Sequence, residues 1–418
     1  FDQKRDILAL EYDQKQHKRL IMKRLVDSEL KTWKTNPRRK PLLLRGARQV
    51  GKTHCVRALG STFDHFVEVN FEMREEFTEL FKADLDPKRI IRDLSILVNL
   101  PIEPGKTLLF FDEVQQVPSA ITALRYFYEN IPELHVIAAG SLIDFAIEKV
   151  GIPVGRVSTM YLFPMTYVEF LGAIGESKLV EALLDLPVSE PIHNKLIRYL
   201  GEYCAIGGMP EAVKLWVEEH NHEACFHVHQ TLVDNYQQDF QKYAKKSQIK
   251  YVETLFKQIP SSIGKRFKYS AIHGEYRKRE LAPALELLGT AGIVHMVHHT
   301  SGQGLPFGSQ INREKFKILF LDIALSQAIL GTHPKDYLVY PKKALVNYGN
   351  MTEAFVGQEL VAYHGPSHKL DLYYWLREVR NSSAEVDYLI KLGDDIVPVE
   401  VKSGSAAHLK SLQYFLNQ

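Results

Sequence analysis

A glycine-bounded loop near the N-terminal end constrains the fold of this chain more than any other feature. Residues 46–53 read G-A-R-Q-V-G-K-T and fit the pattern G-x-x-x-x-G-K-[ST] without a mismatch. The apolar residues 41–44 come directly before this loop, and residues 53–59 predict a helix after it. A buried strand, a glycine-containing loop and a helix N-terminus in this order form a phosphate-binding loop. The motif therefore predicts an α/β fold of the P-loop NTPase class.

The residue types in this loop suit a nucleoside triphosphate. Gly46 and Gly51 allow backbone conformations in which N–H groups turn toward phosphates. Lys52 is predicted to reach the β- and γ-phosphates, and the Thr53 hydroxyl is suited to bind Mg²⁺. We therefore expect ATP and Mg²⁺ as cofactors. The predicted ATP-binding residues are Gly46, Ala47, Arg48, Gln49, Val50, Gly51, Lys52, Thr53 and His54.

The length of the chain predicts several domains. At 418 residues it exceeds the roughly 250–300 residues that one hydrophobic core usually supports. Three widely spaced cysteines without a C-x-x-C pair favour a reducing cytoplasm. No apolar run approaches the roughly 18 residues of a membrane span, so we expect no membrane partner. Because the net charge is only +2, any attraction to nucleic acid must come from local basic patches.

Residues 41–165 predict the nucleotide-binding core, and residues 1–40 before it an N-terminal helical segment. In the core, short apolar segments alternate with helical ones, which is typical of a parallel sheet covered on both faces. The predicted strands are residues 41–44, 65–70, 107–111, 134–139 and 157–162.

The third of these strands ends in two acidic residues. Asp112 follows four apolar residues and is predicted to lie at the sheet edge where phosphates bind, as a second ligand of Mg²⁺ beside Thr53. Glu113, one residue further on, is placed to act as the general base that activates the attacking water.

Two further polar positions follow the fourth strand. Ser141 is predicted to sense the γ-phosphate, although a serine there could equally cap the following helix. Arg156 could reach the nucleotide of a neighbouring copy as an arginine finger, but an ordinary surface arginine is an equally good interpretation. Arg125 is a second candidate for this role.

Six short motifs occur in an order that resembles a known family. They are residues 46–53, 112–113, 140–141, 155–156, 163–166 and 207–211. Together they are similar to bacterial and archaeal AAA+ ATPases that carry a C-terminal domain of unknown function 4143. The resemblance implies an AAA+ core with an additional catalytic glutamate, closed by residues 163–169. It also implies that residues 207–212 belong to a helical lid, which helical periodicity extends over residues 166–245.

Residues 246–321 have the outline of a winged helix–turn–helix. Two helices, one over 251–263 and one starting close to Arg279, precede strands at 293–299 and 314–320 that flank a glycine-rich hairpin. An extended segment is expected at 267–272. Basic side chains give this region a face suited to DNA phosphates, although winged helices also serve as protein–protein adaptors. The predicted DNA-binding residues are Lys265, Arg266, Lys268, Arg277, Lys278 and Arg279.

Residues 322–418 hold a second group of acidic residues. Asp387 ends an extended segment, and a predicted strand at 396–401 carries Glu400, with Lys402 two residues later. The predicted helix 352–363 adds Glu353, or alternatively Glu359. Carboxylates and a lysine that converge in this way can bind Mg²⁺ and activate a water for phosphodiester cleavage.

This second group is similar to the PD-(D/E)XK nucleases and resembles the archaeal Holliday-junction resolvases. The resemblance implies a restriction-endonuclease-like α/β domain, although Val386 stands where the family name has proline. The sequence leaves three hypotheses open. The first is an AAA+ ATPase that couples Mg·ATP turnover to the binding or processing of duplex or branched DNA. The second is a nucleotide-controlled switch or scaffold with an inactive nuclease fold, and the third a nuclease licensed by its ATPase domain. Self-association and a protein partner are compatible with each.

Overall fold

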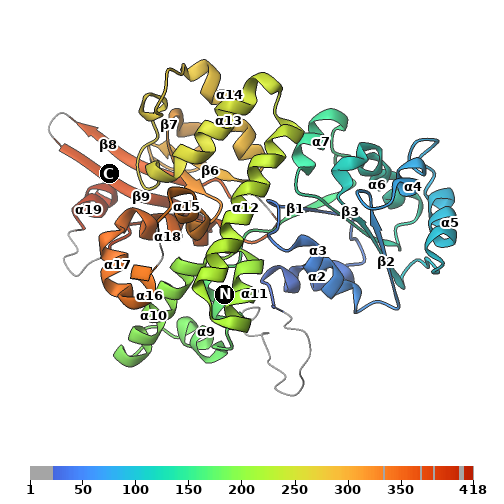
Figure 1. Cartoon of the computed structure of the whole chain (residues 1–418), viewed down its shortest axis with the longest axis horizontal. Coiled ribbons are helices and arrows are strands. Elements are labelled where there is room, and N and C mark those ends of the chain that lie inside the picture. The colour runs from blue at the N-terminus through green and yellow to red at the C-terminus, as the bar shows by residue number, and fades with distance from the viewer. Residues whose placement is uncertain (1–21, 333–334, 368–369, 380–381, 404–408, 418) are drawn as a thin grey trace. The chain divides into compact units, whose positions relative to one another are not determined.

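The computed structural model describes residues 22–332, 335–367, 370–379, 382–403 and 409–417. The chain divides into two compact units (Figure 1). Among the described residues, unit 1 contains 22–165 and 365–367, and unit 2 contains 166–332, 335–364, 370–379, 382–403 and 409–417. Leu8, Leu10, Leu20 and Ile21, on which the N-terminal helical prediction depended, lie outside the described residues. In no part that the structure describes is there a helix long and apolar enough to cross a bilayer.

A five-stranded sheet in the order β2-β3-β4-β1-β5 forms the centre of unit 1. All its neighbouring strands are parallel, which confirms the predicted α/β fold with a parallel sheet. Each strand lies within two residues of its predicted bounds. The strands are β1 Leu42–Arg45, β2 His65–Asn70, β3 Thr107–Asp112, β4 His135–Ala139 and β5 Ser158–Tyr161.

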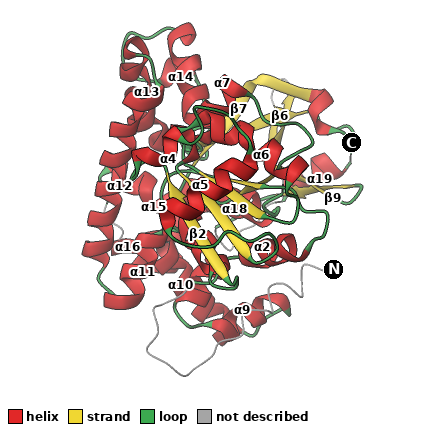
Figure 2. Cartoon of the chain, turned by 90° about the vertical axis from the view of Figure 1, so that its right-hand side faces the viewer, coloured by secondary structure: helices red, strands yellow, loops and turns green. Residues whose placement is uncertain are grey.

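Helices cover this sheet and bury β3 and β4 completely. They are α2 Val26–Thr35, α3 Lys52–Gly60, α4 Glu75–Glu79, α5 Pro87–Val98, α6 Pro118–Asn130 and α7 Ile143–Val150, with the 3₁₀ turn η1 Val114–Gln116 between β3 and α6. Figure 2 shows α5 and α6 lying beside the strands of the sheet. Phe111 of β3 packs against Phe71, Phe81 and Phe127, with ring centroids 5.5–5.9 Å apart. Strands covered on both faces carry continuous apolar runs, which is why these were visible in the sequence.

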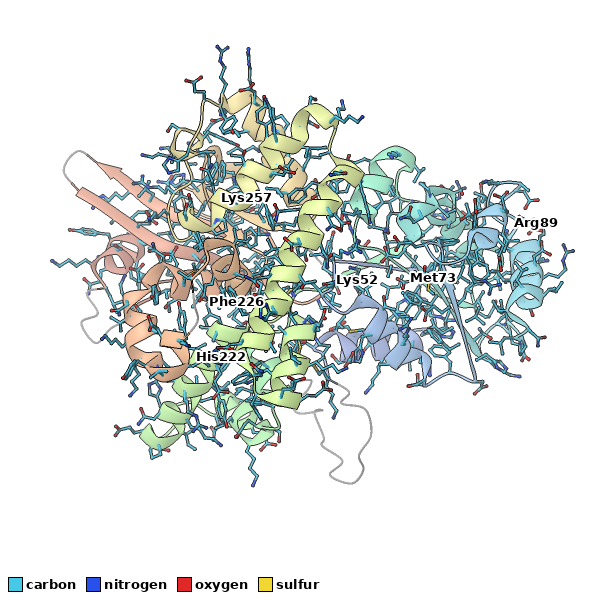
Figure 3. The ribbon with its side chains drawn as sticks, viewed as in Figure 1. Lys52, Met73, Arg89, His222, Phe226 and Lys257 are labelled. Carbon is cyan, nitrogen blue, oxygen red and sulfur yellow. The ribbon has the colours of Figure 1, made fainter. Side chains whose placement is uncertain are left out.

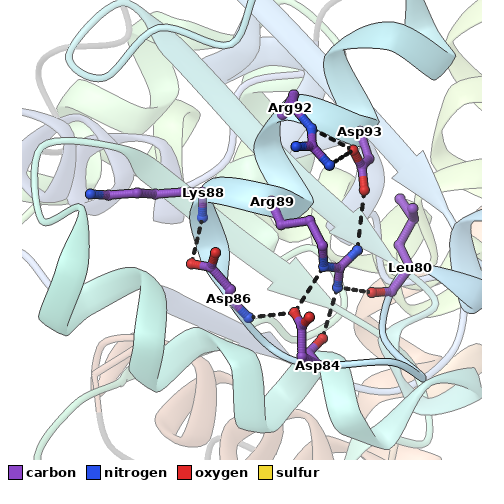
Figure 4. A network of polar contacts seen from close by, with 7 residues as sticks. All are labelled: Leu80, Asp84, Asp86, Lys88, Arg89, Arg92 and Asp93. Atoms are coloured by element: carbon purple, nitrogen blue, oxygen red, sulfur yellow. Dashed lines mark hydrogen bonds and ion pairs between the residues drawn. The ribbon is translucent and has the colours of Figure 1, made fainter.

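Arg89 fixes the loop before α5 (Figure 4). Its guanidinium donates to the Asp84 carboxylate at 2.8 Å, to the Leu80 carbonyl at 2.7 Å and to the Asp93 carboxylate at 3.2 Å. Asp86 caps the N-terminus of α5 by accepting from the Lys88 N–H at 3.2 Å. These contacts hold α5 in place, so that Ile90 and Leu94 pack into the core of unit 1.

The chain also returns to unit 1 late in the sequence. The Tyr161 N–H at the outer edge of β5 donates to the Pro366 carbonyl at 2.8 Å. The short segment around Pro366 therefore supplies a hydrogen-bond acceptor to an edge strand that lies about two hundred residues before it in the sequence.

Unit 2 begins with a run of helices and closes with a second sheet. Its helices are α8 Tyr167–Ala173, α9 Ser177–Leu184, α10 Glu190–Ile206, α11 Pro210–Glu219, α12 His222–Tyr243, α13 Lys246–Gln258, α14 Lys278–Thr290, α15 Ile323–Leu330, α16 Lys335–Val339, α17 Pro341–Asn347, α18 Gly349–Tyr363 and α19 Lys410–Leu416. The short 3₁₀ turns are η2 Ile259–Ser262, η3 Tyr269–Ala271 and η4 Phe307–Gln310. The prediction of an extended segment at 267–272 was wrong in its second half. Arg266 forms a β-bridge with Lys317 of β7, the Phe267 N–H donates to the Phe316 carbonyl at 2.9 Å, and the chain then turns into η3.

The second sheet has the order β10-β9-β8-β6-β7, in which β6 and β8 are parallel and all other neighbours antiparallel. The strands are β6 Val294–Thr300, β7 Ile311–Phe320, β8 Tyr373–Val379, β9 Ser382–Leu392 and β10 Asp395–Val399. Strands β6 and β7 fall where the wing was predicted, and β8–β10 belong to the region predicted to be nuclease-like. The predicted boundary after residue 321 therefore runs through one continuous sheet.

The Gly-Gly motif at 207–208 has a packing role in unit 2. Asp322 caps α15 by accepting from the Leu325 N–H at 2.9 Å, and it also accepts from the Gly208 N–H at 2.7 Å. Gly207 has φ +73°, and a Cβ there would lie 2.4 Å from the Asp322 carboxylate. Glycine is thus required for α10 to approach the start of α15.

Candidate functional site

The loop after β1 has the conformation that a phosphate-binding loop needs. Gly46 has φ +148°, and a Cβ there would lie 2.2 Å from the Leu162 carbonyl oxygen. Gly51 has φ +99° and directly precedes α3. Both positions therefore exclude other residues, and the N–H groups at the start of α3 form an anion-binding end. Ala47 and Val50 are buried, Arg48 is half-buried, and Gln49 and His54 are exposed.

Lys52 is the first residue of α3 (Figure 3), and its side chain turns back over the loop. Its ammonium donates to the carbonyls of Gly46 at 2.9 Å and Ala47 at 2.7 Å. Lys52 is only 8% exposed, and this burial lowers its pKa to about 8, against the opposing effect of Glu113 and Asp112. The hydrogen-bond acceptors of this buried ammonium are neutral carbonyls, and the phosphates of a bound triphosphate would provide its counter-charge.

Asp112 lies at the carboxyl end of β3, in register with Asn70 of β2. Its Oδ2 accepts from the Thr53 hydroxyl at 3.1 Å and from the Asn70 amide at 3.4 Å. Burial raises the pKa of Asp112, and the nearby Glu113 raises it further. The structure thus brings the two predicted metal ligands within hydrogen-bonding distance. A hydroxyl and a carboxylate oxygen fit Mg²⁺, which prefers hard oxygen ligands.

Glu113 stands in a backbone conformation that is unusual for a residue with a side chain, with φ +52°. Its carboxylate accepts a hydrogen bond from Gln115 Nε2. The Gln115 Oε1 atom is buried without a hydrogen-bond partner among the described residues, and a Cβ at Gly140 would lie 1.9 Å from it. Gln115 therefore fills the space beside Gly140 and holds the predicted general base.

Ser141 follows directly on Gly140, at the end of β4, which lies between β1 and β3 in the sheet. It is 9% exposed, and its hydroxyl is buried without a partner in the described part of the chain. Because β4 separates the strand of the phosphate-binding loop from the strand of Asp112, Ser141 lies between these two groups. A buried hydroxyl in this position can donate to a phosphate oxygen or to water.

Sequence reasoning missed two residues of this site. Gln115 could have been suspected, since it comes two residues after Glu113. Arg24 could not, because it precedes the loop by more than twenty residues with no motif around it. Arg24 is buried and donates to the carbonyls of Val50 at 2.8 Å and Phe163 at 2.7 Å. It thereby ties the phosphate-binding loop to the segment that follows β5.

Arg156 and Arg125 meet on one carboxylate. Arg156 Nε and Arg125 Nε lie 2.9 and 3.0 Å from the same oxygen of Glu129, on α6. These contacts lower the pKa of the Glu129 carboxyl. Both arginines are exposed, so their pairing is weak. An arginine-finger role in a neighbouring copy stays a prediction.

The carboxylates of unit 2 surround a lysine that sequence reasoning did not single out. Lys317 Nζ, on β7, lies 2.8 Å from Glu353, 2.5 Å from Glu385 and 3.6 Å from Asp387. The Lys317 side chain is 3% exposed. Burial raises the pKa of Glu353 to about 7, although Lys317 opposes this.

The other predicted nuclease residues are placed differently from expectation. Strand β10 ends at Val399, so Glu400 and Lys402 lie after the strand and not on it, where they pair with each other. The chain leaves the ladder there because Asp387 Oδ2 accepts from the Val401 N–H at 2.8 Å. Across the described ranges, no three His, Cys, Asp or Glu side chains are arranged to hold a metal ion.

Glu359, the alternative to Glu353, has a separate structural position. Both of its carboxylate oxygens accept from the Tyr167 N–H at 3.1 Å, at the N-terminus of α8. Glu359 is buried, which raises its pKa to about 8. Glu359 therefore joins α18 to α8 within unit 2.

The six residues of the predicted DNA-binding face are all exposed. They lie in the segment between η2 and α14 and at the start of α14. Two of them already have acidic partners, since Lys278 pairs with Glu314 and Arg266 lies 4.0 Å from Glu385. We refer to these six side chains, 265, 266, 268 and 277–279, as the basic face.

Three family models match separate parts of the chain. Residues 38–171 match an AAA domain, which includes the phosphate-binding loop and Asp112-Glu113. The chain carries an AAA-type P-loop ATPase domain. Residues 348–418 match the domain of unknown function DUF4143, which confirms that part of the resemblance. Residues 197–336 match another domain of unknown function, DUF8612, whose range crosses the boundaries predicted after residues 245 and 321.

No curated protein sequence matches the chain significantly. Among solved structures, similarity is found to the Walker-type ATPase PABY2304 of Pyrococcus abyssi, with 16% identity, a TM-score of 0.47, and coverage of 73% of this chain and 95% of that one. C. elegans PCH-2 has 11% identity, a TM-score of 0.26, and coverage of 48% and 63%. Drosophila ORC bound to DNA has 12% identity, a TM-score of 0.28, and coverage of 79% and 98%. All three scores are low, so no ligand or partner is transferred from these proteins.

Proposed function

We propose that this protein hydrolyses ATP with Mg²⁺ at the site in unit 1 and couples turnover to the binding or processing of DNA through unit 2. The observation that carries the ATPase part is the hydrogen bond of 3.1 Å between Thr53 and Asp112, beside the buried ammonium of Lys52. Two hard oxygen ligands and a buried cation thus stand next to backbone N–H groups at a helix N-terminus. The cation and the N–H groups complement the negative phosphates of ATP, and the two oxygen ligands suit its Mg²⁺.

In this mechanism each polar residue has one task. The N–H groups of the loop and the Lys52 ammonium bind the phosphates, and the Ser141 hydroxyl donates to the γ-phosphate. Glu113, held by Gln115, accepts the proton of the attacking water. Thr53 and Asp112 would hold Mg²⁺, whose charge would offset that of the phosphate oxygens.

ATP affinity should depend on pH through Lys52. The pKa of Lys52 is about 8 in the nucleotide-free protein, and a bound triphosphate raises it by favouring the charged form. Above about pH 8 the free protein therefore loses the proton that binding requires, and the Kd for ATP should rise by up to about tenfold per pH unit. Calorimetric titration with Mg·ATP between pH 7 and 9.5 measures this. Lys52→Ala should bind and hydrolyse ATP weakly at every pH, and undiminished turnover in that variant would remove the ATPase assignment.

Gln115 should affect turnover and not binding. Gln115→Ala frees the Glu113 carboxylate, and the loss of one hydrogen bond to a charged group costs about 1.5–3 kcal/mol. We therefore expect kcat to fall about 10- to 100-fold with KM unchanged. Steady-state phosphate release measures both constants. The matched control is Gln116→Ala, since Gln116 is the exposed neighbour and should leave kcat unchanged. A rise in KM at constant kcat would contradict the assigned role.

The basic face is the candidate DNA contact, and its affinity should depend strongly on salt. Each phosphate that a lysine or arginine neutralises contributes about −0.9 to the slope of log K against log salt. Lys265 and Arg279 are both exposed, and removing either one should reduce that slope by about one unit. Lys178, exposed on α9, serves as the control position. A flat salt dependence in fluorescence anisotropy with duplex and branched DNA would exclude this face.

A second candidate is a nucleotide-controlled switch or scaffold whose unit 2 binds DNA or protein without cutting it. The position of Lys317 among the acidic residues favours this candidate over a metal-dependent nuclease. Incubation of supercoiled DNA with Mg²⁺ or Mn²⁺ separates the two. Nicking that disappears in Asp387→Ala would establish the nuclease, whereas DNA binding without nicking would establish the switch.

A further inference from the structure

We propose that the Lys317 ammonium takes the place of a divalent metal in unit 2, so that its carboxylate cluster is neutralised without Mg²⁺ or Mn²⁺. The cluster consists of Glu353 from α18 and of Glu385 and Asp387 from β9. This inference does not depend on ATP hydrolysis in unit 1 and concerns metal binding by unit 2.

The geometry around Lys317 is that of a cation with its ligands. Its Nζ lies 2.8 Å from Glu353 and 2.5 Å from Glu385, both within hydrogen-bonding distance, and 3.6 Å from Asp387. An ammonium group has three N–H donors, and three acidic side chains lie around it. Since Mg²⁺ binds oxygen at about 2.0–2.1 Å, it would need the same oxygen atoms that Lys317 already contacts.

The surroundings hold the ammonium in this position. The Tyr374 ring centroid lies 5.3 Å from Lys317 Nζ, so the cation also lies near an aromatic ring. Tyr388 donates to the Glu353 carbonyl at 2.8 Å and thereby fixes that part of α18 against β9. With a side chain only 3% exposed, Lys317 cannot swing into solvent without moving the packing around it.

Charge and hydrogen bonding account for the rest of the cluster without a metal. Asp387 has its second oxygen occupied by the Val401 N–H at 2.8 Å. Glu385 has a second cation, Arg266, at 4.0 Å. Lys402, the predicted catalytic lysine, is paired with Glu400. A divalent ion added to this arrangement would be repelled by Lys317 and would find Glu353, Glu385 and Asp387 already engaged.

The test is metal binding by the nucleotide-free full-length chain, measured with Mn²⁺ by electron paramagnetic resonance. Wild type and Asp387→Asn should bind the same number of Mn²⁺ ions, because the cluster holds none in either. Loss of a Mn²⁺ site on Asp387→Asn substitution would overturn the proposal. This comparison does not depend on ATP turnover and stands even if the ATPase assignment fails.

A second variant tests whether the lysine stands where a metal could bind. Lys317→Met keeps the length of the side chain and removes its charge, so the freed carboxylates should acquire one additional Mn²⁺ site. That site should disappear in the double variant with Asp387→Asn. A folded Lys317→Met protein without the additional site would overturn the idea that the ammonium substitutes for a metal. If the variant does not fold, the comparison of wild type with Asp387→Asn still decides.

Discussion

The Glu113→Gln protein is expected to bind Mg·ATP as tightly as wild type and to hydrolyse it about 10²–10⁴ times more slowly. A glutamine preserves the shape of the side chain and its contact with Gln115 but cannot accept a proton from water. General base catalysis contributes a factor of this size. Phosphate release under saturating ATP measures kcat, and calorimetry with Mg·ATP measures affinity.

The control for this experiment is Glu72→Gln, at an exposed glutamate that follows β2 in the same unit. It should change neither kcat nor affinity. If Glu113→Gln retained more than about a tenth of the wild-type kcat, another group would have to activate the water. The ATP-bound form of Glu113→Gln should also persist long enough to retain whatever DNA or protein partner the nucleotide state favours.

The Lys317→Ala protein is expected to be destabilised in unit 2 by about 3–5 kcal/mol, because partly buried carboxylates would lose their buried cation. Lys317 contacts Glu353 and Glu385 at 2.8 and 2.5 Å and is almost fully buried. Urea unfolding followed by tryptophan fluorescence measures the change, since Trp375 lies buried in β8 of the same unit. Unit 1 should unfold as in wild type.

Lys257→Ala is the matched control, because Lys257 is an exposed lysine of unit 2 on α13 (Figure 3). Its effect should stay within about 0.5 kcal/mol. A double-mutant cycle sharpens the result. Adding Glu353→Gln to Lys317→Ala removes one of the unpaired carboxylates and should recover part of the lost stability. Equal stability of Lys317→Ala and wild type would show that the ion pairs contribute nothing net.

Most of the fold of unit 1 could be predicted, because the signals are local in sequence. The apolar runs at 107–111 and 134–139 belong to strands buried on both faces, so their residue types alone identify them. Likewise, the phosphate-binding loop is a contiguous motif whose two glycines have φ values that other residues avoid. The parallel sheet and the meeting of Thr53 with Asp112 follow from these two features.

Unit 2 was harder to predict for a physical reason. Its sheet joins β6 and β7 to strands that lie more than fifty residues further along the chain, and nothing local encodes that pairing. Lys317 is one of four charged residues on β7, with Arg313, Glu314 and Lys315, and nothing in the sequence marks it as the buried one. Its burial depends on Glu353 and Glu385, which come from distant elements. The prediction that the last strand extends to residue 401 was wrong for a similar reason. The Asp387 carboxylate accepts from the Val401 N–H, and β10 ends at Val399.

The hydrogen bond between Tyr161 and Pro366 has a practical consequence for dissecting this protein. A fragment that stops after Met165 would contain the complete ATP-binding motif set but would leave the outer side of β5 with an unsatisfied donor. Bare strand edges of this kind recruit other chains and promote aggregation. Unit 1 consequently cannot be isolated intact by a single truncation after Met165.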